Sequence, residues 1–163
     1  MHRFTPRRHP HHYAESLGYV FLTWRLHRKQ PVLRPGERDA VLPIVGRLDG
    51  AGNHVRAAVV MDDHVHALFY LGSPQSIGAI AHTWKSLSAH RLTKEWERFA
   101  PIWQRDYFDR AVGSLADVER CTRYILDNPS RRWPELTIYR WIIRPSADSG
   151  RATGEEGRAT GPA

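Results

Sequence analysis

Residues 54–71, with the sequence HVRAAVVMDDHVHALFYL, decide the predicted fold. Two apolar runs, at 54–61 and 64–71, are separated only by Asp62 and Asp63. Two strand-like runs joined by a pair of turn-favouring residues predict a β-hairpin with the aspartates at its turn. The hairpin supplies the middle strands of the predicted fold.

Alternating elements are predicted on both sides of this hairpin. Residues 19–26 are rich in β-branched and aromatic side chains and predict a strand. The segment 37–48 predicts a helix that Pro43 should break or kink. Further helices are expected at 75–99 and 115–128, the second ended by Pro129, with a strand at 102–108 between them. The order β-α-β-β-α-β plus a helix predicts an α+β, ferredoxin-like sheet with helices on one face and an added C-terminal helix.

Composition limits the class of protein. The 163 residues suit one domain, and a formal charge of +7 suggests a polyanionic partner such as nucleic acid, although solubility alone can explain such a charge. The single Cys121 cannot form an internal disulfide, which is typical of reducing compartments. No apolar run approaches the ~18 residues of a membrane span, and the His-rich N-terminus lacks a signal-peptide core. We therefore expect a cytoplasmic protein without membrane contact.

Both ends of the chain differ in composition from the middle. Residues 1–17 are basic and predict a flexible arm. Residues 146–163 carry the stretch Gly-Arg-Ala-Thr-Gly twice and have few apolar side chains able to offset the entropy of ordering, so we predict a disordered tail. The folded domain is expected at 18–145.

Two histidines begin the second strand of the hairpin. His64 and His66 stand two residues apart, so the strand repeat places both imidazoles on one face and Val65 on the other. Paired imidazoles on a strand are half of a divalent metal site. Two surface histidines would show the same spacing, and the pattern alone does not separate these interpretations.

The last predicted helix offers partners for the histidines. Tyr124 and Asn128 lie four residues apart, at one border of the apolar stripe that contains Ile125. A phenol and an amide at that border can face a sheet that carries two imidazoles. Alternatively, Tyr124 is a boundary aromatic residue and Asn128 caps the helix before Pro129.

Three segments together resemble a known family. They are Met61-Asp62-Asp63-His64-Val65-His66, Trp103-Gln104-Arg105-Asp106-Tyr107-Phe108-Asp109 and Tyr124-Ile125-Leu126-Asp127-Asn128-Pro129. In this order they resemble the single-tyrosine HUH transposases, and more narrowly the REP-associated tyrosine transposases. The resemblance implies a metal-dependent endonuclease and strand transferase that acts on single-stranded or hairpin DNA through a 5′-phosphotyrosine, and it is compatible with a homodimer.

The resemblance also implies roles for individual residues. His64, His66 and Asn128 match the ligands of Mg²⁺ or Mn²⁺, and Tyr124 matches the nucleophile, with Tyr107 as a rival. Two departures stand out: Asp62-Asp63 replaces the family's Pro-Asn, and Ser130-Arg131-Arg132 replaces a small apolar continuation. Basic side chains are candidates for phosphate contacts: Lys85, Arg91, Arg105, Arg120, Arg123 and Arg131.

Two other functions remain open at this stage. A catalytically inactive nucleic-acid-binding module on the same scaffold is one, although all four candidate site residues are present. An unrelated metal hydrolase is the other; a third histidine at the next alternate position would favour it, but Leu68 stands there.

Overall fold

The computed structural model describes residues 18–73 and 75–146. The expectations of a flexible arm at 1–17 and of disorder at 147–163 therefore lie outside the described residues. Within the described part of the chain, no helix is both long enough and apolar enough to cross a membrane.

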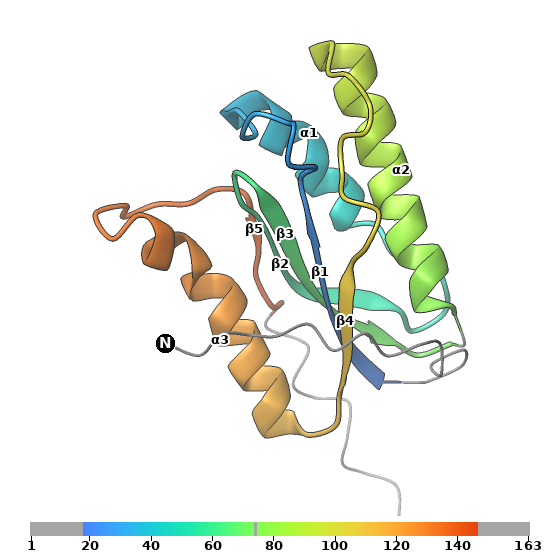
Figure 1. The fold of residues 1–163 in the computed structure, drawn as a ribbon. Helices are drawn as coiled ribbons and strands as arrows, with labels where there is room; N and C mark the ends of the chain where they lie inside the picture. The colour runs from blue at the N-terminus through green and yellow to red at the C-terminus, as the bar shows by residue number, and fades with distance from the viewer. Residues whose placement is uncertain (1–17, 74, 147–163) are drawn as a thin grey trace, which may run out of the picture.

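A five-stranded antiparallel sheet forms the centre of the fold, with strands in the order β4-β1-β3-β2-β5 (Figure 1). The strands are β1 Gly18–Arg25, β2 His54–Val60, β3 His64–Leu71, β4 Phe108–Val112 and β5 Ile142–Ile143. The helices are α1 Pro35–Val45, α2 Ile77–Trp96 and α3 Leu115–Arg132. The predicted α+β, ferredoxin-like sheet with an added C-terminal helix is confirmed, and β5 is a further short strand.

The predicted hairpin is β2 and β3. Val60 pairs with Val65, and the Met61 N–H donates to the carbonyl of His64 at 2.8 Å, so Asp62 and Asp63 form the turn. β3 then pairs with β1 on its other side, which makes it the central strand of the sheet. The candidate histidines therefore stand at the start of a strand held on both edges.

The two faces of the sheet carry separate cores. On one face, Val65, Ala67 and Phe69 of β3 pack with apolar residues of α1 and α2. On the other face, Leu68 packs with residues of α3 that include Val118 and Ile125. Figure 1 shows α1 and α2 on one side of the strands and α3 on the other. Because side chains alternate along a strand, His64 and His66 share the α3 face with Leu68.

Helix α1 does not break at Pro43. It continues two residues further, to Val45, so the expected break at this proline is wrong. Val41 and Val45 lie one turn apart and are both fully buried in the core. Their burial holds the last turn against the sheet despite the backbone hydrogen bond that proline cannot make.

Helix α3 also continues past a proline, because it ends at Arg132 and not before Pro129. The last turn is held by tertiary contacts. Arg132 donates to Asp62 at 2.8 Å, and the ring of Trp133, just after the helix, stacks on Tyr139 with centroids 5.8 Å apart. These contacts outweigh the cost of about 3 kcal/mol that proline carries inside a helix.

The strand expected at 102–108 lies later, at β4. Ile102 and Trp103 are buried in the core under α2, and the Trp103 indole N–H donates to the Ser88 hydroxyl at 2.9 Å. Trp103 forms an isolated antiparallel bridge with Leu26, and continuous pairing with β1 begins at Phe108, opposite Thr23. The predicted strand is therefore interrupted: residues 102–103 contribute one bridge and core packing, and the strand itself lies at β4.

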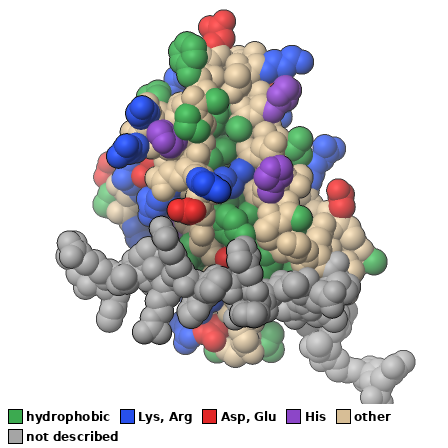
Figure 2. All heavy atoms as spheres, turned by 45° about the vertical axis from the view of Figure 1, so that its right-hand side comes forward, with side chains coloured by type: hydrophobic (Ala, Val, Ile, Leu, Met, Phe, Trp, Pro, Cys, Tyr) green, Lys and Arg blue, Asp and Glu red, His purple; other side chains and the backbone are tan. Residues whose placement is uncertain are grey.

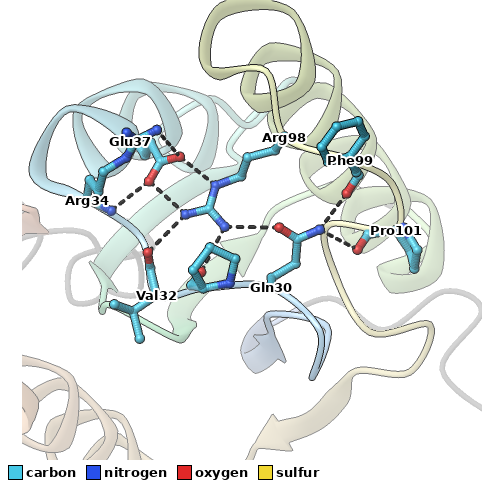
Figure 3. Close-up of polar contacts among 8 residues, drawn as sticks. Gln30, Val32, Arg34, Glu37, Arg98, Phe99 and Pro101 are labelled. Carbon is cyan, nitrogen blue, oxygen red and sulfur yellow. Dashed lines mark hydrogen bonds and ion pairs between the residues drawn. The ribbon is translucent and has the colours of Figure 1, made fainter.

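A buried ion pair joins the start of α1 to the end of α2 (Figure 3). The Arg98 guanidinium donates to both carboxylate oxygens of Glu37, at 2.5 and 2.8 Å. Its other N–H groups donate to the carbonyls of Pro31 and Val32 and to the Gln30 side chain. All five guanidinium donors are satisfied, which makes the burial of this charge tolerable.

The Glu37–Arg98 pair predicts acid sensitivity. Burial opposes ionisation of Glu37, but hydrogen bonds from Arg98 and Arg34 outweigh it and lower the pKa from 4.5 to about 2. The pair therefore stabilises the fold fully above pH 4.5 and loses this contribution as the pH falls toward 2. Glu37→Gln should lower the free energy of unfolding at pH 7 by about 3 kcal/mol and flatten its pH dependence in that window.

Urea unfolding between pH 7 and pH 3 measures this effect. The matched control is Glu95→Gln, because Glu95 pairs with Arg91 on the surface of α2 and should contribute well under about 1 kcal/mol. Equal losses of stability in the two variants would contradict the prediction.

Candidate active site

The four residues singled out from the sequence lie together between β3 and α3. The rings of His64 and His66 have centroids 4.6 Å apart. The Asn128 Oδ1 lies 3.3 Å from Nε2 of His64, and the Tyr124 ring lies 5.2 Å from the ring of His66. The two imidazoles and the amide are at most 9% exposed, whereas Tyr124 is 38% exposed. The cluster is thus a buried polar group that reaches solvent beside the phenol.

Helix α3 positions the phenol and the amide. It begins after Ser114, whose hydroxyl accepts the Asp117 N–H, and its apolar residues bury against the sheet. Tyr124 and Asn128 are one turn apart on the side that faces β3. Asn128 lies four residues before the end of the helix, so the alternative role as a helix cap is wrong.

Asp63 orients the first imidazole. Its Oδ1 lies 2.5 Å from Nδ1 of His64. This hydrogen bond is the largest cause that lowers the pKa of Asp63 from 3.8 to about 2; the charges of His64, Arg132 and Arg25 also lower it, and burial opposes them. The ionised carboxylate can only accept, so Nδ1 of His64 donates to it, and the opposite ring atom, Nε2, lies 3.3 Å from Oδ1 of Asn128.

Thr23 holds the second imidazole in place. Its hydroxyl lies 2.6 Å from Nδ1 of His66, and the two residues are direct partners in the β1–β3 register. The ring of Phe21 stacks on the other side of His66, with centroids 5.5 Å apart. Burial, and then the neighbouring His64, lower the pKa of His66 well below its usual value, so this imidazole is neutral near pH 7.

The donor set fits a divalent cation. Nε2 of His64 lies 3.3 Å from Oδ1 of Asn128, and an imidazole nitrogen and an amide oxygen are both atom types that bind divalent cations. His66 adds a second imidazole beside them. Among residues 18–73 and 75–146, no group of three or more His, Cys, Asp or Glu side chains could hold a metal ion. A site here therefore needs the amide oxygen as its third protein ligand.

The candidate phosphate contacts do not form one group. Lys85 lies on α2, across the sheet from the histidines, and donates to the Arg105 carbonyl at 2.7 Å; burial lowers its pKa. Arg91 is engaged by Glu95 and by the Ala40 carbonyl. Figure 2 looks toward the α2 side, where Lys, Arg and His side chains are spread over the upper half among apolar ones.

The basic residues of α3 stand closer to the site. The Arg131 guanidinium lies 5.2 Å from the centroid of the Tyr124 ring, a cation–π contact that places positive charge beside the phenol. Arg120 pairs with Asp117 on the same helix, and Arg123 is exposed. Of the six candidates, only Arg131 contacts a residue of the cluster.

Three residues orient the site in ways that the sequence did not predict. Thr23 lies on another strand, and only the register of β1 against β3 identifies it. Asp63 precedes His64 directly, an available signal, but the pattern indicated only a turn and a departure from the family's Pro-Asn. Arg132 contacts Asp62 across the turn, which required α3 to extend past Pro129.

The protein is of the α+β class, and a histidine pair on its antiparallel sheet faces a helix that carries a tyrosine. The family model "Transposase IS200 like" matches residues 16–128, a range that includes both histidines, Tyr124 and Asn128. The chain belongs to this IS200-like transposase family, and the family expected from the three motifs is confirmed.

A solved structure shares the fold, and a second is similar over part of its length. A REP-associated tyrosine transposase bound to a REP hairpin aligns with a TM-score of 0.60 at 20% identity, over 78% of this chain and 75% of that one. A transposase candidate from Deinococcus radiodurans R1 aligns with a TM-score of 0.49 at 20% identity, over 76% of this chain and 97% of that one. No curated protein shows significant sequence similarity to the chain.

The Thr23–His66 contact predicts an effect on cation binding. Thr23→Val keeps the side-chain shape but removes the hydroxyl that fixes the imidazole, so the affinity for Mn²⁺ should fall about tenfold. Electron paramagnetic resonance of free Mn²⁺ during a titration measures this affinity. Thr83→Val, at an exposed position of α2, is the control; equal affinities in the two variants would argue against a positioning role for Thr23.

Proposed function

We propose that the chain is a single-stranded DNA endonuclease and strand transferase in which Tyr124 is the nucleophile. One observation carries the proposal: the half-exposed phenol lies against His66 while Asn128 lies against His64, on one side of one sheet. Membership of the transposase family supports DNA as the substrate.

The proposed reaction exchanges one phosphodiester for another. The Tyr124 oxygen, having given up its proton, attacks the phosphorus, and the bond from phosphorus to the 3′-oxygen breaks. The products are a 5′-phosphotyrosine and a 3′-oxygen that takes up a proton as a hydroxyl. A 3′-hydroxyl can later attack the phosphotyrosine, which releases Tyr124 and joins two strands.

His64, His66 and Asn128 would hold Mg²⁺ or Mn²⁺ in this proposal. Such an ion neutralises phosphate charge and orients the scissile bond. The chain itself positions the donors: Asp63 holds the His64 ring through Nδ1, and burial keeps His66 neutral. Arg131 adds a fixed positive charge beside the phenol, where negative charge develops.

The rival nucleophile stands elsewhere. Tyr107 precedes β4, lies near the ammonium of Lys85 from α2 and contacts none of the four cluster residues. Burial, and then the charge of Asp109, raise the pKa of Tyr107, which disfavours its phenolate. Tyr124 has the donor set beside it, and we assign the attack to Tyr124.

A basic pocket supports Arg105 as a DNA contact. A cavity of about 500 Å³ is lined by His27, Arg28, Pro101, Trp103, Gln104 and Arg105. Arg25, the last residue of β1, is the register partner of His64 in β3. The first lining residue, His27, lies two residues further along the chain, so the pocket is at the end of β1 that lies beside His64. Its lining contains cationic groups and no carboxylate, which suits a phosphate group of a bound strand.

The proposal also concerns the form of the DNA substrate. The transposase with the same fold was solved bound to a REP hairpin. We propose that this chain likewise acts on DNA with a hairpin and a single-stranded flank.

Covalent trapping tests the nucleophile. End-labelled hairpin DNA with a single-stranded flank, incubated with the protein and Mn²⁺, should give a protein–DNA adduct that survives denaturing electrophoresis. Tyr124→Phe should abolish the adduct, because the attacking oxygen is gone, and Tyr107→Phe should retain it. Loss of the adduct only in Tyr107→Phe would move the nucleophile, and no adduct in the wild-type protein would favour an inactive binding module.

Salt dependence of binding tests the pocket. Arg105→Ala should weaken binding of single-stranded DNA of any sequence and lower the slope of log affinity against log salt by about 0.7. Fluorescence anisotropy at several salt concentrations measures both quantities. Arg47→Ala, an exposed arginine just after α1, is the control, and an unchanged slope in Arg105→Ala would exclude a phosphate contact.

A further inference from the structure

Three side chains of α3 meet three side chains at the start of β3, one by one. Tyr124 lies against His66, with ring centroids 5.2 Å apart. Asn128 lies against His64, with Oδ1 and Nε2 3.3 Å apart. Arg132 donates to the Asp62 carboxylate at 2.8 Å. From one contact to the next, the residue number on α3 increases by four. The residue number of its partner, on β3 and then on the turn before it, decreases by two.

The spacing of the two elements explains this match. Four residues of α-helix rise about 6.0 Å, and two residues of strand rise about 6.7 Å. Between the first two contacts the mismatch is only about 0.7 Å, which side chains can absorb, and the third contact continues from the strand into the turn before it. A sliding of α3 by one residue would move all three contacts by about 1.5 Å and rotate each side chain by about 100°, so the three contacts depend on one register.

The third contact differs from the other two because it uses full charges and lies outside the candidate metal site. Asp62 is only 8% exposed, and its Oδ1 is buried without a hydrogen-bond partner. The Arg132 guanidinium therefore makes the one side-chain bond that the Asp62 carboxylate receives among the described residues. A carboxylate buried in this way is costly without its cation.

Both ends of the Asp62–Arg132 pair are tied to the rest of the fold. The Asp62 carbonyl accepts the Leu33 N–H at 2.6 Å, which anchors the turn to the segment before α1. Arg132 is the last residue of α3, and the N–H of the next residue donates to the Pro129 carbonyl at 2.8 Å. The pair thus connects a fixed turn to the end of a helix that would otherwise be expected to stop at Pro129.

We propose that Asp62 and Arg132 are a positioning pair that sets the register of α3 over β3, and so the separation between Asn128 and His64. This role rests on the proposed function in one respect: the two groups whose separation the pair sets, Asn128 and His64, are the proposed metal ligands. Neither member of the pair touches the reacting atoms. The pair positions the site indirectly. Arg132 lies one helical turn from Asn128 on α3, and Asp62 lies two residues before His64.

The experiment uses the full chain and two readouts. The first is the Mn²⁺ dissociation constant, and the second is the NMR spectrum of the metal-free protein, in which the Asn128 side-chain amide and the His64 ring nitrogens report their contact. Arg132→Gln should raise the dissociation constant about tenfold and shift both sets of signals. Arg132→Lys keeps the charge and should restore the affinity to within about threefold of the wild-type value.

Two further variants separate positioning from general stability. Arg140→Gln removes a different arginine–aspartate pair, with Asp39 on α1, and should leave both readouts unchanged. Asp62→Asn breaks the pair from the turn side with little change in shape and should reproduce the effect of Arg132→Gln. Wild-type Mn²⁺ affinity and unshifted Asn128 and His64 signals in folded Arg132→Gln or Asp62→Asn would overturn the proposal.

The two proposals fail in different ways. A wild-type protein that forms no DNA adduct contradicts the proposed reaction, whereas the metal-free NMR signals decide the register proposal without DNA or catalysis. Shifted signals in Arg132→Gln and Asp62→Asn, with none in Arg140→Gln, support the positioning pair even where the adduct is absent.

Discussion

The alternation of side chains along β3 determines where everything else in the site can lie. Val65, Ala67 and Phe69 must bury under α1 and α2, so the residues between them face α3. A slip of one residue in the pairing would place the imidazoles in the apolar core and the apolar side chains under α3. Pairing with β1 and β2 on both edges prevents such a slip. The position of the histidine pair is therefore a consequence of how the central strand is buried.

Burial gives the polar cluster its chemical character. His66 is neutral because its surroundings disfavour charge, and Asp63 is charged because His64 and nearby arginines favour charge. The result is a neutral imidazole at His66 and a carboxylate charge beside His64, which suits cation binding. Of the four cluster residues His64, His66, Tyr124 and Asn128, only Tyr124 is exposed to a substantial degree. A DNA backbone would therefore approach from the side of the phenol.

The sequence predicted the hairpin, the sheet and the shared face of the histidines because each depends on local periodicity. It failed where tertiary contacts override a local signal. Pro43 predicted a break or kink and Pro129 predicted a helix end, yet Val45 in one helix and Arg132 in the other hold the following turn in place. The pattern at 102–108 predicted a strand, but Trp103 serves the core.

The site shows the same division between local and tertiary information. Helical spacing placed Tyr124 next to Asn128, and strand spacing placed His64 next to His66. No local pattern could bring the two pairs together; the resemblance to a family supplied that step. Thr23 and Arg132 were missed because their roles depend on strand register and on the true length of α3. Contacts between elements have no signal within either element alone.

The content of this cluster argues for an active site and against a binding surface alone. Nucleic acid binding requires positive charge at the surface, and neither a buried imidazole nor a buried amide contributes that. Apolar side chains of similar size between β3 and α3 would bury more favourably than these polar groups. The chain instead carries His64, His66 and Asn128 there, with Asp63 and Thr23 to orient the two rings. A buried polar cluster that costs stability is the arrangement expected where chemistry is performed.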